Sequence, residues 1–183
     1  MAFKNKEISN PKTGQSIRFI QTSKDTGGVL LEMESCYNKN SVEPVAHYHP
    51  FQEEDFHVVE GELTVRIHGE QKILKRGERL RIEKNVVHSM WNSSSFKAVV
   101  KWKVVPAMNT EFLLETTMGL AREGKTDDSG KPGIFQAAVM MNAFTNVFRL
   151  ASPPFVVQRI VFTLLSPISF LLGYRSTYRH YLD

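Results

Sequence analysis

The residues best suited to chemistry lie between His47 and Glu54, in the segment HYHPFQEE. Two histidines at positions i and i+2 of a strand point to the same face, because side chains alternate sides with a period of two. Glu54 follows after a tight proline turn and can bring a carboxylate to the same point, and His88 can join from a neighbouring strand. Imidazole nitrogens with one carboxylate suit Fe, Ni, Mn, Cu or Zn. We therefore expect one divalent transition metal, of open identity, to be held by His47, His49, Glu54 and His88.

These residues and the glycines that follow them resemble the two sequence motifs of the cupin superfamily. The first motif, H-x-H-x4-E-x6-G, is matched by His47, His49, Glu54 and Gly61. The spacing of the second motif is matched by Gly77, His88 and Asn92. The resemblance covers roughly residues 29–105 and implies a small metal-binding cupin, whose fold is an antiparallel β-barrel, also called a double-stranded β-helix or jelly roll.

Two details refine this resemblance. Glu53 also has a spacing that occurs in the family, but the six-residue interval to Gly61 favours Glu54 as the ligand and leaves Glu53 outside the metal's own ligand set. The chain departs from the motifs at Ser41, where the family has glycine, and at Glu83 and Asn85, which replace a proline and a glycine. These are turn positions, so the departures concern loop geometry.

The elements around the motifs are predicted to be strands. Residues 16–105 contain short segments rich in Val, Ile, Leu and Phe, separated by glycine turns, and residues 31–36 and 63–68 alternate in polarity. After Pro106 the pattern changes to helical spacing over residues 110–122 and 134–150. The sequence therefore predicts a mainly β protein, with a cupin barrel over residues 1–105 and a helical extension over residues 106–183 that packs on the barrel or on a dimer partner.

The same alternation predicts what surrounds the metal. Met33, Phe56, Met90 and Trp102 fall on inward positions, which indicates an apolar pocket for a small apolar or aromatic organic molecule. A metal with open coordination positions in such a pocket favours a metal-dependent dioxygenase, with Glu54 also able to act as a base. A non-catalytic binding or sensor protein and a metal-dependent isomerase or decarboxylase remain alternatives, so whether the chain is an enzyme stays open.

Composition narrows the partners and the compartment. The net charge is +4, but Lys and Arg are interleaved with acids, which argues against a nucleic-acid-binding protein. A single cysteine excludes an internal disulfide, and the polar amino terminus has no apolar segment typical of a secretory signal, so we expect a cytoplasmic protein. We also expect a homodimer, because cupins commonly pair through sheets or exchanged amino-terminal strands.

The segment from Phe155 to Gly173 is strongly apolar, but Arg159 and Pro167 interrupt it. Its polar residues gather on one side of a helix, which predicts an amphipathic helix and not a membrane span. We expect its apolar face to pack on the outer face of the barrel or on a partner subunit. A helix lying on a membrane surface is the alternative.

Overall fold

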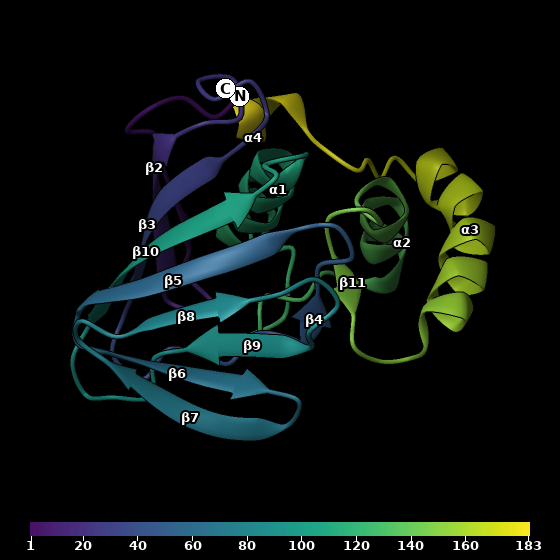
Figure 1. Cartoon of the computed structure of the whole chain (residues 1–183). Helices are drawn as coiled ribbons and strands as arrows, with labels where there is room; N and C mark the ends of the chain where they lie inside the picture. The colour runs from purple at the N-terminus through teal and green to yellow at the C-terminus, as the bar shows by residue number, and fades with distance from the viewer.

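The computed structural model describes residues 1–183 and places two antiparallel β-sheets beside a group of helices (Figure 1). The first sheet has, in spatial order, strands β1 (Glu7–Asn10), β2 (Gln15–Gln21), β3 (Leu31–Tyr37), β10 (Ala98–Val105), β5 (Glu53–Glu60) and β8 (Arg79–Ile82). The second has β11 (Arg149–Leu150), β4 (His47–Tyr48), β9 (His88–Trp91), β6 (Glu62–Ile67) and β7 (Glu70–Lys75). The predicted mainly β class is confirmed. The sheets do not close into a barrel, but their arrangement is consistent with a jelly roll.

The strands form because their side chains alternate between the core and the surface. In β3 every second residue from Leu31 to Tyr37 is buried, and in β5 the buried residues are Glu54, Phe56 and Val58. One core cluster joins Phe56 of the first sheet to Leu63 and Met90 of the second, so this core lies between the two sheets. The alternation that buries Phe56 also fixes Glu54 on the inner face of β5.

Four helices follow or flank the sheets: α1 (Thr110–Arg122), α2 (Ile134–Ala143), α3 (Phe155–Leu171) and α4 (Arg179–Leu182). Met118 of α1 joins a second core cluster with residues of β1, β2 and β3, so α1 closes one end of the first sheet. A third cluster unites Leu120, Met140 and Tyr181 from α1, α2 and α4. None of the helices has the length and hydropathy that crossing a membrane requires.

The prediction of one helix over residues 134–150 is wrong at its carboxyl end. Helix α2 ends at Ala143, and residues 149–150 form β11, which pairs with β4 through Arg149 opposite Tyr48 and Leu150 opposite His47. Pairing with β4 gives this backbone the hydrogen-bond partners that a longer helix would otherwise have supplied. The division of the chain at residue 105 stays a prediction, but β11 shows that the later part of the chain completes the second sheet.

Helix α3 packs on α2, as Figure 1 shows at the periphery of the molecule. Its buried residues are Gln158, Phe162, Ser166 and Ser169, while most of its other large apolar side chains are exposed. In the single chain, the outer face of the barrel therefore does not cover the apolar face of α3, contrary to expectation. Cover by a partner subunit stays a prediction.

The turn between β5 and β6 depends on Gly61, the glycine that ends the first motif. Gly61 has φ of +73°, and a Cβ atom there would lie 2.3 Å from the carbonyl oxygen of Lys97. Gly69 has φ of +87° but open space around it. Both glycines allow a left-handed backbone, and only Gly61 also allows close contact between two backbone segments.

We predict that Gly61→Ala lowers the free energy of unfolding by roughly 3 kcal/mol, from the left-handed backbone together with the steric clash. The matched control Gly69→Ala should lower the free energy of unfolding by only about 1 kcal/mol, because it strains the left-handed backbone without creating a steric clash. Urea denaturation of the two variants measures the difference. Equal losses would show that the approach of Lys97 does not constrain this turn.

Candidate metal centre

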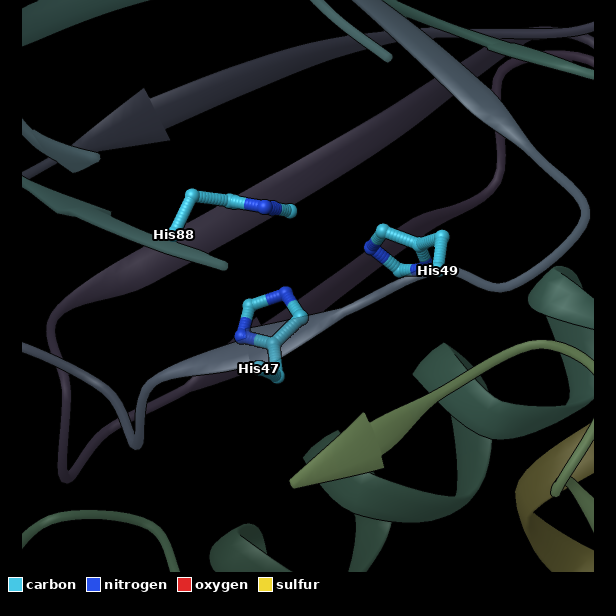
Figure 2. A group of neighbouring side chains, drawn as sticks. All are labelled: His47, His49 and His88. Carbon is cyan, nitrogen blue, oxygen red and sulfur yellow. The ribbon is translucent and has the colours of Figure 1, made fainter. Parts of the chain in front are cut away.

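Three histidines come together on the inner side of the second sheet. His47 in β4 lies directly opposite His88 in β9, and His49 follows two residues after His47 on the same side. One nitrogen from each ring lies within 4.8 Å of the other two. Figure 2 shows the three rings turned toward one another. Three imidazoles at this spacing could hold one metal ion.

Backbone carbonyls determine which ring nitrogen faces the centre. The Nδ1 atoms of His47 and His88 lie 3.0 Å and 2.9 Å from the carbonyl oxygens of Val45 and Val86, and Nδ1 of His49 lies 2.5 Å from that of Val147. A carbonyl oxygen can only accept, so each Nδ1–H donates. Each Nε2 is therefore the atom left to bind a metal, and the carbonyls fix the ring orientations.

Glu54 adds a carboxylate to the three nitrogens. Its Oε2 atom lies 2.9 Å from Nε2 of His88 and 3.3 Å from Nε2 of His49. Its Oε1 atom accepts a hydrogen bond of 3.0 Å from Nε1–H of Trp102. Oε2 of Glu54 and Nε2 of His49 are buried without a hydrogen-bond partner. Facing lone pairs of this kind need a cation between them, so the residues fit a divalent metal.

The electrostatics of the centre agree with metal binding. Burial, and then the charges of His88 and His49, hold the pKa of His47 well below its ordinary value, so that ring is neutral and able to ligate at pH 7. Burial alone would raise the pKa of Glu54, but His49 and His88 outweigh it and hold that pKa well below the usual value. Burial opposes the charge on His49, yet Glu54 raises its pKa above the ordinary value.

Comparison with known proteins assigns part of this chain to a family. Residues 33–104 match the family model described as "Cupin domain". The chain therefore contains a cupin domain. Tetracenomycin polyketide synthase protein TcmJ of Streptomyces glaucescens is 31% identical over 98 residues, which are 52% of this chain and 64% of that protein. Quercetin 2,3-dioxygenase of Bacillus subtilis is 30% identical over 113 residues, 61% of this chain and 32% of that protein.

The chain therefore spans less than two thirds of either curated relative. Among solved structures, an RmlC-like cupin from Shewanella frigidimarina superimposes with a TM-score of 0.49 and 20% identity. That superposition covers 61% of this chain and 94% of the other.

The structure accommodates the residues at which this chain departs from the cupin motifs. Asn85 stands at the glycine position with φ of +64°, a backbone conformation that asparagine adopts more readily than most residues. Ser41, at the other glycine position, accepts a hydrogen bond of 2.8 Å from the backbone N–H of Asn92. Glu53 points away from the histidines and pairs with Arg81 on the surface. These substitutions leave the metal centre intact.

A cavity of about 1050 Å³ opens beside the metal centre of this cupin. The sheets contribute Phe56, Met90 and Trp102 to its lining, three of the four residues that the sequence places in the pocket. The fourth, Met33, lies fully buried in the core cluster formed with α1, because Met118 covers that end of β3. Met33 is not among the lining residues, which is a correction to the predicted pocket.

The helical part of the chain supplies much of the remaining lining and two contacts to the metal centre that the sequence does not reveal. Its lining residues include Leu113 from α1, Met140 from α2 and Phe162 from α3. Val147 orients His49 through its carbonyl, and the ring of Phe148 stacks on His47 at 4.5 Å between centroids. No motif marks either residue, because a backbone acceptor can be any residue and an aromatic neighbour about 100 positions away follows no fixed spacing.

We predict that the purified cupin binds about one equivalent of a divalent transition metal and that His49→Ala loses most of it. Removing a ligand should lower affinity more than the roughly 10- to 100-fold that loss of an outer hydrogen-bond partner costs. His57→Ala is the matched control, because His57 lies in β5 three positions from Glu54 and outside the cluster. Elemental analysis after dialysis gives the answer. Wild-type protein that stays metal-free in excess Fe, Ni, Mn, Cu and Zn would contradict the site.

We also predict that metal binding releases protons and strengthens as pH rises. The pKa of His49 is raised, so this ring is protonated below that pKa and must lose its proton to ligate. Affinity should therefore increase with pH up to the raised pKa and level off above it. Calorimetry in buffers of different ionisation enthalpy counts the protons released, and more protons per metal are expected below the pKa of His49 than above it. A heat that is the same in every buffer would show that His49 is already neutral.

Proposed function

We propose that this cupin is a metal-dependent dioxygenase of a small apolar or aromatic organic molecule. The observation that supports it most directly is the position of the three histidines and Glu54 on the wall of a largely apolar cavity of about 1050 Å³. Cavities of roughly 300–1,000 Å³ with apolar walls and a few polar groups are typical small-molecule sites. The proposal joins the metal and the cavity into one site.

The cavity offers an aromatic wall beside the metal centre. The rings of Phe56 and Trp102 stack with centroids 5.7 Å apart and an angle of 19° between their planes. Tyr37 also lines the cavity, and burial raises the pKa of its hydroxyl to about 12, so it is neutral at pH 7. A flat aromatic molecule fits such a wall better than a phosphorylated sugar does, because phosphate groups require cationic partners.

Glu54 is the residue placed to move a proton. Trp102 holds its Oε1 atom, and this leaves Oε2 directed toward the metal centre. When a substrate hydroxyl is bound there, Oε2 can take its proton, and Trp102 keeps the carboxylate oriented meanwhile. A divalent metal held by the histidines would supply a Lewis-acidic centre with open coordination positions. Dioxygenation transfers both atoms of O₂ into the organic molecule, so the reaction balances without an added reductant.

One relative, quercetin 2,3-dioxygenase, has a name that describes this class of reaction, and the other is named a polyketide synthase protein. The first of these names supports testing oxygenation. Because the chain covers only 32% of the dioxygenase, the activity and its substrate are proposals for this cupin.

We predict oxygen uptake when metal-loaded protein is mixed with a panel of catechols, flavonols and diketones. An oxygen electrode should record uptake with at least one compound, at about one O₂ per molecule consumed. His49→Ala should abolish it, and His57→Ala should retain it. Saturable quenching of tryptophan fluorescence without uptake would instead favour a binding protein. Conversion to an isomer without uptake would favour an isomerase.

A further inference from the structure

Helix α3 carries large apolar side chains on the side that faces away from the protein, called here the outer face of α3. Leu164 and Leu171 are 69% and 89% exposed. At 100° per residue the members of this face lie within an arc of about 120°. The outer face consists of Val156, Val157, Ile160, Leu164, Ile168 and Leu171.

The orientation of α3 is fixed by partnered polar groups on its inner side. The side-chain amide of Gln158 donates to the carbonyl oxygens of Leu150 and Pro153 at 2.8 Å and 2.6 Å. Ser166 accepts from Asn142 of α2 at 2.6 Å. These buried polar groups would lose their partners if α3 rotated its apolar side inward. The apolar outer face is therefore a built feature of the helix.

The charged residues of α3 and of the segment that follows it to residue 182 are basic. Residues 129–182 contain no Asp or Glu. Arg159 is exposed on α3, and Arg175 and Arg179 follow its carboxyl end. The side chain of Arg179 is 94% exposed, with only a 4.0 Å contact to Asp183. A second copy docked symmetrically would bring these arginines toward their equivalents, whereas an anionic surface complements them.

We propose that the outer face of α3 docks on the surface of an anionic lipid bilayer. An amphipathic helix with a wide apolar face, flanking arginines and no acidic residue lies in the plane of a membrane interface. The helix has 17 residues and contains Pro167, which suits a surface position. Tyr174 follows the helix, and tyrosines favour the headgroup region.

The cavity borders this docking surface. Val161 of α3 is 38% exposed and lines the cavity, as do the neighbouring Gln158 and Phe162. An apolar molecule dissolved in the bilayer could therefore reach the metal centre with little transfer through water. This step, unlike the docking itself, rests on the proposed function.

The test is flotation of the full-length protein with vesicles. The protein should float with mixed phosphatidylglycerol and phosphatidylcholine vesicles and remain at the bottom with phosphatidylcholine alone. The double variant Leu164→Glu, Leu171→Glu should reduce flotation at least about ten-fold. The matched control is Val29→Glu, Phe96→Glu, because these residues are 65% and 76% exposed and lie outside α3. Equal metal content in all proteins shows that they are folded.

The contribution of the arginines to membrane binding is measured separately. Arg159→Gln and Arg179→Gln should each weaken binding about five-fold at low salt, and added salt should weaken the wild type. Wild-type protein that fails to float with anionic vesicles would overturn the proposal, as would equal flotation with neutral ones. If light scattering shows a dimer that the variant Leu164→Glu, Leu171→Glu dissociates, and the protein does not float, the outer face of α3 binds a second copy of the chain. Flotation without oxygen uptake would support the docking proposal and reject the dioxygenase proposal.

Discussion

The metal centre depends on one electrostatic constraint: buried imidazole nitrogens face a buried carboxylate oxygen at 2.9 Å and 3.3 Å. Three backbone carbonyls accept hydrogen bonds from the Nδ1–H groups, so the lone pairs of the rings point inward. Lone pairs and a negative charge brought together out of water repel, and only a cation between them makes the arrangement stable. The strands position the histidines, and a cation bound between them would stabilise the arrangement.

That constraint also connects the two parts of the chain. Two of the orienting carbonyls, those of Val45 and Val86, lie two residues before the histidine they hold, so the local backbone suffices. The third belongs to Val147, 98 residues from His49. Pairing of β11 with β4 holds this segment in place, and Phe148 covers His47. The helical extension is therefore part of the metal centre, although its sequence contains no ligand.

The sequence predicted what local geometry determines. Alternation along a strand placed His47 and His49 together and put Phe56, Met90 and Trp102 beside the cavity. It failed for Met33, because alternation indicates the inner face of a sheet but not what covers each end of that face. It could not find Val147, because a carbonyl group has no residue-type signature. It predicted the amphipathic α3 but not its orientation, since periodicity separates the faces without indicating which one meets the protein.

The same reasoning explains why the family match leaves the substrate open. The match covers residues 33–104 and so ends before α1 begins. It contains the histidines, Glu54 and the aromatic wall, which together determine how a metal would be bound. Much of the cavity lining comes from α1, α2, α3 and the segments between them, all outside the match. Selectivity for the proposed organic molecule would depend on those helices, and relatives that share only the matched region can share the metal chemistry while differing in what they bind.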